Sequence, residues 1–319
     1  MIYTRLTTKL MSDNIIENLL NNRGKLNQLQ EQLSSGKRIS TPSEDPTATM
    51  NILSDQTILS QNENFTENIN NAIAELEVTD KSILTVIDIV HRAKELTVQA
   101  ANATSGTDQL AAINNSIKQL INQVRDIGNS QYSSKYIFGG LNTENPPFQN
   151  VGTTNPEIRY NGTAATGNYQ RKTEINQNVT IDMNIPGDEV FGQYYQSAAG
   201  PPPVYTGSGL IKTLVTLSEE LGTSPPDYDA IRSKIGNLDT DLSTLLNAQS
   251  QIGGTLAILE NTKSKLSDDT LTYTKRKSEL QDIDLAKTIS DIQFQENALQ
   301  VSLSVGAKVI QSNLLDYLK

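Results

Sequence analysis

Apolar residues recur at helical spacing near both ends of this 319-residue chain, and this pattern most constrains its fold. Within residues 5–33 the apolar seam consists of Ile15, Leu19, Leu26, Leu29 and Leu33. Within residues 285–318 one row is Ile289, Ile292, Leu299, Leu303, Ile310 and Leu314, and a second is Ala298, Val301, Val305 and Val309. A lone amphipathic helix gains little stability until its stripe is covered. The two end helices should therefore pack together and against copies of the chain.

Long helices are also predicted between the chain ends. A break at residues 34–46 contains two prolines, and the helical spacing then resumes over residues 47–103. The next seam consists of Leu110, Ile113, Ile117, Leu120, Val124 and Ile127, which predicts an antiparallel helical hairpin. A short helix over residues 210–221 and a long one from Tyr228 to Tyr273 follow after the middle of the chain.

The middle of the chain has a period of two instead. Ile158 and Tyr160 alternate before Asn161-Gly162, a strong tight-turn signal, and residues 169–175 and 179–185 alternate again. Residues 200–203, Gly-Pro-Pro-Pro, should be extended and stiff. We expect a small β domain in this part of the chain.

These patterns predict a mainly α protein, an elongated rod of long coiled-coil-type helices from both termini with a small inserted β domain. The predicted domains are a terminal helical domain for assembly, a helical rod and a β-rich domain. They cover residues 1–46 with 275–319, residues 47–140 with 209–274, and residues 141–208.

The composition leaves little material for catalysis. The chain has no Cys and a single His, His91, so thiol chemistry and multi-histidine metal cages are excluded. Gly139-Gly140 and Gly253-Gly254 lack the spacing of a nucleotide fingerprint and are interpreted as a turn and a close helix approach. Asp268-Asp269 and the nearby acidic residues are interpreted as solvated faces and helix N-caps. We therefore expect no catalytic residues, no cofactor and no metal.

The charge and the N-terminus bear on partners and location. A formal net charge of −10 argues against binding to nucleic acid or to an anionic membrane, so the partners should be proteins. Residues 1–6 lack the apolar run of a secretory signal, and no apolar run of 18 or more residues could span a membrane.

Three motifs carry a family resemblance. Residues 33–39, Leu-Ser-Ser-Gly-Lys-Arg-Ile, and residues 42–46, Pro-Ser-Glu-Asp-Pro, resemble the N-terminal signature of bacterial flagellins and their relatives. Residues 136–140, Tyr-Ile-Phe-Gly-Gly, and residues 311–318, Gln-Ser-Asn-Leu-Leu-Asp-Tyr-Leu, resemble the end of the N-terminal helical part and the C-terminus of the same superfamily. Within it, three features are more similar to the hook–filament junction members than to filament flagellin: Asp45-Pro46, the Phe-Gly-Gly segment of residues 138–140 and the C-terminal motif.

The resemblance implies a structural adaptor of the bacterial flagellum, outside the cell at the hook–filament boundary. Members of this family can carry catalytic insertions, but the insertion here has no His and no nucleophile–base arrangement, so we expect no enzyme. It implies type III export and four kinds of partner: other copies of the chain, a hook-side hook-associated protein, flagellin and a cytoplasmic export chaperone. Two alternatives remain open, a filament flagellin and a secreted coiled-coil tip or effector protein of another export system. The predicted assembly interface consists of Leu19, Leu26, Leu33, Ile289, Ile292, Leu299, Leu303, Ile310 and Leu314.

Overall fold

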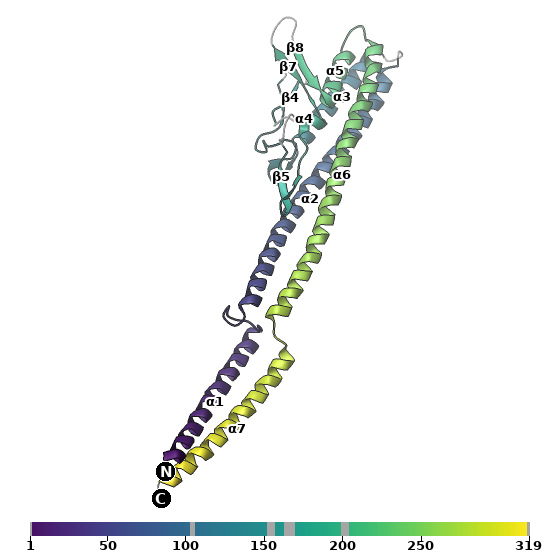
Figure 1. Cartoon of the computed structure of the whole chain (residues 1–319). Coiled ribbons are helices and arrows are strands. Elements are labelled where there is room, and N and C mark those ends of the chain that lie inside the picture. Colours follow the sequence, from purple (N-terminus) through teal and green to yellow (C-terminus); the bar gives the residue numbers. More distant parts are fainter. Residues whose placement is uncertain (1, 103–105, 152–156, 163–169, 199–203, 318–319) are drawn as a thin grey trace. The chain divides into compact units, whose positions relative to one another are not determined.

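The computed structural model describes residues 2–102, 106–151, 157–162, 170–198 and 204–317 (Figure 1). The side chains of residues 2–9, 11, 198, 204 and 309–317 lie outside this description. The helices are α1 Ile2–Ser35, α2 Pro46–Ala100, α3 Thr107–Gly128, α4 Gly187–Val190, α5 Gly209–Leu221, α6 Tyr228–Gln281 and α7 Leu285–Tyr317. The strands are β1 Gln131–Tyr132, β2 Lys135–Tyr136, β3 Phe148–Asn150, β4 Ile158–Tyr160, β5 Lys172–Asn176, β6 Val179–Asp182, β7 Gln193–Ala198 and β8 Val204–Ser208.

The prediction of a mainly α protein with a small β region is confirmed, and every predicted long helix is present. The chain forms two compact units, one of residues 1–61 with 267–319 and one of residues 62–266. We call them the terminal unit and the central unit. The predicted division into three domains stays a prediction.

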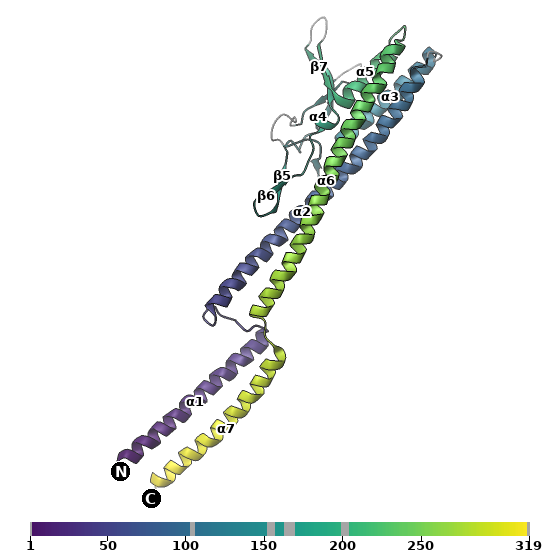
Figure 2. The ribbon, with the colours of Figure 1, turned by 45° about the vertical axis from the view of Figure 1, so that its right-hand side comes forward.

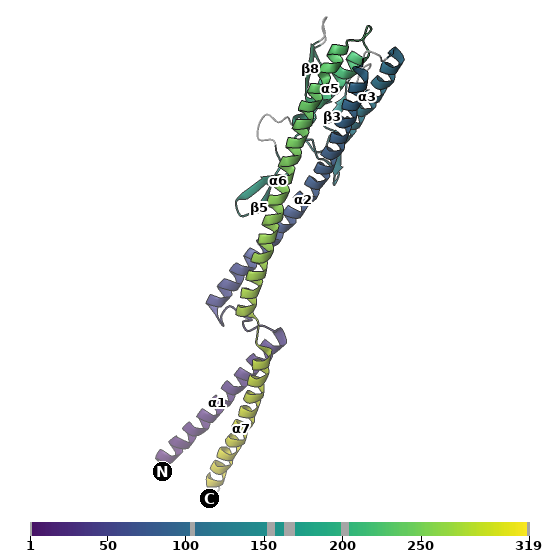
Figure 3. The ribbon, with the colours of Figure 1, turned by 90° about the vertical axis from the view of Figure 1, so that its right-hand side faces the viewer.

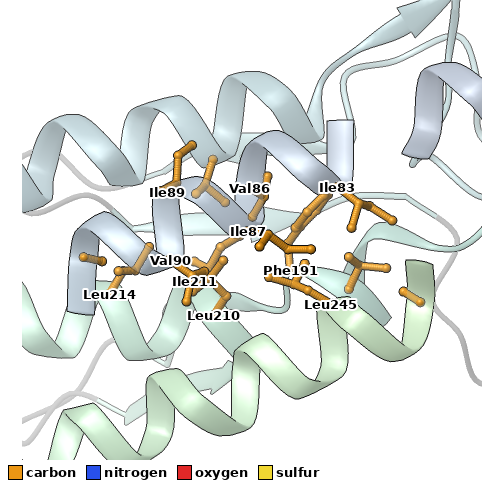
Figure 4. Close-up of a cluster of buried hydrophobic side chains, with 14 of the residues drawn as sticks. Ile83, Val86, Ile87, Ile89, Val90, Phe191, Leu210, Ile211, Leu214 and Leu245 are labelled. Atoms are coloured by element: carbon orange, nitrogen blue, oxygen red, sulfur yellow. The ribbon is translucent and has the colours of Figure 1, made fainter. Parts of the chain in front are cut away.

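The core of the central unit lies where α2, α3, α5 and α6 meet. Figure 4 shows Phe191 beside Ile83 of α2 and Leu245 of α6, with Leu210 and Ile211 of α5 next to them. All five side chains are almost completely buried. Removing this much apolar surface from water stabilises the unit by about 1.5–3 kcal/mol per large side chain, before the entropy of ordering is subtracted.

One predicted seam needs a correction in α3. Ile121 is buried in the core, whereas Leu120 and Ile127, which the spacing placed in the seam, are only half-buried. Leu120 is three residues after Ile117 and Ile121 is four, and either spacing places a residue on the same face of a helix as Ile117. The buried row follows Ile117, Ile121 and Val124, so it is shifted slightly around the helix from the predicted row.

The β region contains a four-stranded antiparallel sheet in the order β3-β4-β7-β8 and two separate two-stranded ladders. The Asn161-Gly162 signal does not join paired strands, because β4 pairs with β3 and β7 while β5 pairs with β6. The tight turn between β5 and β6 lies instead at Gln177–Asn178, where Asn178 has a φ of 60°. Tyr169 and residues 200–203 lie outside the described residues.

In the terminal unit α1 and α7 run side by side, as the views in Figures 2 and 3 agree. Helix α1 ends at Ser35, and Gly36 follows with a φ of 70°, the left-handed conformation that commonly terminates a helix at glycine. The predicted break between α1 and α2 is confirmed. A small cluster of Ile39, Ala48 and Ile52 is buried against Leu280.

The interpretation of Gly253-Gly254 as a close helix approach is wrong. Both glycines lie inside α6, and a Cβ atom built on either would meet nothing within 4 Å. The turn at Gly139-Gly140 is present, and Gly140 has a φ of 66°. None of the described helices combines the length and the apolar character needed to cross a membrane.

Candidate assembly surface

The facing sides of α1 and α7 carry a polar link between apolar contacts. Asn22 Nδ2 donates a hydrogen bond to Ser302 Oγ at 3.1 Å, and Gln295 Nε2 donates to Asn22 Oδ1, also at 3.1 Å. A Cβ atom on Gly306 would lie 3.2 Å from Cγ2 of Ile15, so the helices approach closely there. A polar group inside a helical seam fixes which residues of the two helices meet.

The structure distributes the predicted interface residues over different faces. Leu19 and Leu26 of α1 and Ile292 and Leu299 of α7 are half-buried on the helix pair. The exposed ones are Leu33, Ile289 and Leu303, at 37%, 45% and 52%. Ile310 and Leu314 belong to α7, and their side chains lie outside the described part.

A second set of apolar side chains on α7 points away from the pair. Phe294 is 73% exposed, Val301 62% and Val305 48%, and they are spaced along one helical stripe that passes through Ala298. The sequence had indicated the row of Ala298, Val301 and Val305, but it missed Phe294, which extends that row by one turn. We call Phe294, Ala298, Val301 and Val305 the outer stripe. Exposed apolar patches of this kind are typical of surfaces that bind other proteins.

Helix α1 also presents apolar side chains that were missed. Leu10, Ile16 and Leu20 are 63%, 51% and 61% exposed. Ile16 and Leu20 are four residues apart and so share a face of the helix. The sequence shows these apolar residues, but they do not follow the heptad spacing of Leu19 and Leu26, so the spacing did not predict them as part of the interface.

The signature motif at residues 33–46 forms caps. Glu44 Oε2 accepts hydrogen bonds from the amides of Ser40 and Thr41, at 2.8 and 3.3 Å. Asp45 Oδ1 accepts one from the amide of Ala48 at 3.0 Å, which caps α2, and Pro46 occupies the first helical position. The expectation of acidic N-caps is likewise met at Asp284, whose Oδ1 accepts from Lys287 N at 3.1 Å.

Several ionisable groups are buried in the central unit. Burial raises the pKa of Asp241 on α6, although a hydrogen bond with Thr213 acts in the opposite direction. Burial also raises the pKa of Glu219, whose Oε2 accepts a hydrogen bond from the Tyr194 hydroxyl at 3.3 Å, and raises the pKa of Tyr194 to about 12. Glu75 of α2 forms an ion pair with Arg171, which ties the segment before β5 to the helix.

These groups do not converge on a reaction centre. A surface hollow of about 460 Å³ between α2 and α3 is lined by apolar and charged side chains, among them Ile89, Leu120, Ile127, Asp88 and Asp126. His91, the one histidine of the sequence, is exposed on α2. In the part of the chain that the structure describes, no three His, Cys, Asp or Glu side chains lie together in a way that could hold a metal ion.

Comparison with known proteins agrees with this arrangement. A family described as "Bacterial flagellin N-terminal helical region" matches residues 6–143. Flagellar hook-associated protein 3 of Escherichia coli strain K12 is 26% identical over 308 residues, which span 93% of this chain and 94% of that protein. The crystal structure of Bacillus cereus FlgL aligns with a TM-score of 0.54 and 25% identity, over 69% of this chain and 97% of that one. The flagellar junction protein FlgL from Legionella pneumophila has the same fold, with a TM-score of 0.57 at 15% identity, over 73% of this chain and 100% of that one.

The helix pair formed by the two chain ends exposes apolar residues on both helices, which is typical of a surface that binds another protein. Residues 6–143 are similar to this flagellin family, in agreement with the resemblance of the N-terminal motifs. Over 93% of its length the chain is similar to flagellar hook-associated protein 3.

Proposed function

We propose that this chain is a structural adaptor of the bacterial flagellum that joins the hook to the filament. The observation that carries the proposal is the similarity to flagellar hook-associated protein 3, which spans 93% of this chain. The exposed apolar side chains of α1 and α7 support it, because a surface of this kind needs a protein partner.

The mechanism of the adaptor is mechanical. Contacts between α1 and α7 of neighbouring copies hold a ring together, and the ring contacts a hook-side hook-associated protein on one side and flagellin on the other. The outer stripe supports this role, since Phe294, Val301 and Val305 are exposed in the single chain. The predicted residues Leu19, Leu26, Ile292 and Leu299 then align the helix pair, while Ile289 and Leu303 add to the exposed apolar area.

The other parts of the proposal follow from the same role. The adaptor lies outside the cell, reaches the hook–filament boundary by type III export and is bound by an export chaperone in the cytoplasm. It has no enzymatic activity, and its partners include neither nucleic acid nor membrane. The absence of Cys from the sequence is compatible with threading an unfolded chain through a narrow channel.

Localisation tests the adaptor role. Because the chain has no Cys, the single substitution Val179→Cys on the exposed start of β6 gives a site for a thiol-reactive gold or dye label. In cells that lack the native gene, we expect one labelled point on each flagellum, at the end of the hook. Label along the whole filament would indicate a filament flagellin, and label away from flagella would indicate a tip or effector protein of another system.

A pair of variants tests the outer stripe. Val301→Asp places a charge on the stripe, whereas Gln300→Asp places one on the neighbouring exposed position of α7. We expect Val301→Asp to fold normally, because Val301 is 62% exposed, and to lose incorporation and motility. Gln300→Asp should keep both. Normal incorporation of Val301→Asp would remove the outer stripe from the assembly surface.

A further inference from the structure

Both halves of the chain interrupt their helices at the same place in the terminal unit. Arg38 N donates a hydrogen bond to Gln281 O at 2.6 Å, and Ile283 N donates to Gly36 O at 3.2 Å. Lys37 and Asp282 between them form an antiparallel bridge. The segment after α1 and the segment between α6 and α7 are therefore paired as in a very short β ladder.

The Arg38 side chain adds a contact to the end of α6. Its Nη2 donates a hydrogen bond to Leu280 O at 2.8 Å. The last carbonyl groups of a helix have no partner inside the helix. Arg38 thus satisfies two of them, Leu280 O with its guanidinium and Gln281 O with its backbone amide.

The same residue is linked to both neighbouring helices of the N-terminal half. Its carbonyl oxygen accepts a hydrogen bond from Gln32 Nε2 of α1 at 2.9 Å. Its Nη1 lies 3.9 Å from Oδ2 of Asp45, which caps α2. The next residue, Ile39, is buried against Leu280, and this contact also holds the backbone after Arg38 against the end of α6.

We propose that Arg38 is a positioning residue that holds the two helix breaks together as one clasp and thereby keeps α1 and α7 aligned. The clasp itself follows from contacts within the chain. Its value for incorporation into the flagellum rests on the function proposed above.

The chemistry of the side chain favours Arg at this position. A guanidinium presents several N–H groups in a fixed plane, so it can reach Leu280 O and lie near Asp45 at once, whereas a lysine has one flexible ammonium. The ion pair with Asp45 contributes little, because both side chains are well exposed, at 48% and 38%, and the charges are 3.9 Å apart. The two hydrogen bonds from Arg38 to the end of α6 therefore provide most of the stabilisation of the clasp.

Hydrogen exchange of the Ile283 amide in the full chain tests the clasp directly. Arg38→Ala should make this amide exchange at least about tenfold faster, as expected when a local opening becomes easier. Arg38→Lys should give an intermediate rate, because the charge remains but the fixed fork is lost. Arg23→Ala, which removes the same charge from an exposed position of α1, and Asp45→Asn should leave the rate unchanged. Unchanged exchange in Arg38→Ala, or an equal effect of Asp45→Asn, would overturn the proposal.

A second measurement separates the clasp from the proposed function. Incorporation of Arg38→Ala into flagella should fall while thermal unfolding of the central unit stays at the wild-type temperature, and Arg38→Lys should restore part of the incorporation. Faster exchange with full incorporation would overturn the role of the clasp in assembly. If Val179→Cys labels no hook boundary and yet Arg38→Ala exchanges faster, the proposed function fails and the clasp within the chain stands.

Discussion

Asn22 and Ser302 are 280 positions apart in the sequence and share a hydrogen bond of 3.1 Å across the pair of terminal helices. Gln295 completes the link by donating to both the side-chain and the backbone oxygen of Asn22. Around this link the pair is held by half-buried side chains, and among the described side chains of α1 none is fully buried. Because the two helices bury little apolar surface between them, this polar contact contributes strongly to their alignment.

Asn22→Ala should loosen the terminal pair. Loss of a part-buried hydrogen bond costs about 1 kcal/mol, so the amides around residues 19–26 and 295–302 should exchange roughly fivefold faster. Asn21→Ala, at the exposed neighbouring position, is the control. Equal exchange rates in the two variants would show that the link does not stabilise the pair.

Leu259→Asp should destabilise the central unit strongly. Leu259 of α6 is fully buried, and an unpaired charge there costs several kcal/mol, which lowers the melting temperature by about 10 °C. Ile258→Asp changes the adjacent side chain, which is 53% exposed, and should leave melting nearly unchanged. Leu256 of the same helix is only half-buried, so Leu256→Asp should fall between them. Similar melting of the first two variants would contradict this assignment of the core.

The buried carboxyl of Asp241 should make stability depend on pH. Burial raises its pKa in the folded chain above the value of about 3.9 in the unfolded chain, so the folded state binds more protons between the two values. Stability should therefore fall as the pH rises through the raised pKa.

Asp241→Asn removes this titration, and urea unfolding at a series of pH values from 3 to 7 measures the effect. We expect the variant to be more stable than the wild type at the neutral end of the series, and the difference to shrink toward the acid end. Asp268→Asn on an exposed face of α6 is the control and should leave the wild-type stability unchanged across the series. A difference that stays constant over the whole series would refute a raised pKa at Asp241.

Protease should cut the terminal unit first. Helices α1 and α7 cover each other only partly, whereas the central unit has many side chains with no exposed surface. Brief trypsin treatment of the purified chain should remove about the first 35 and the last 35 residues and leave a stable fragment, identified by mass spectrometry. First cuts at Arg92 or Lys94, on the part of α2 that belongs to the central unit, would contradict this prediction.

The helices could be predicted because their apolar spacing is regular over many turns. The break between α1 and α2 could be predicted because Gly36 and Pro42 oppose a helix, while Pro46 suits only the start of one. The face of α7 that meets α1 could be predicted only in part. Ile292 and Leu299 lie on it as predicted, but so do Gln295, Ser302 and Gly306, which are polar or small and which a count of apolar residues misses.

The polar contacts between distant residues could not be predicted from the sequence either. Asp55 of α2 is fully buried, and its Oδ1 lies 2.9 Å from Nη2 of Arg276 on α6, more than 200 residues away. Glu75 is paired in the same way with Arg171. Such pairs depend on the three-dimensional fold, because neither residue carries a local signal of its partner. Strand pairing in the β region could not be predicted for a related reason. Asn161-Gly162 indicates a turn, but it does not indicate which strands pair with each other.

The two compact units differ in the continuity of their sequence, and this difference affects the order in which they fold. The central unit is one continuous segment, residues 62–266, whereas the terminal unit needs both ends of the polypeptide. Closing a loop of more than 200 residues is slower than forming contacts within a segment. The central unit should therefore fold first, and the terminal helices should meet last. A nascent or truncated chain without α7 would leave α1 with its apolar face uncovered.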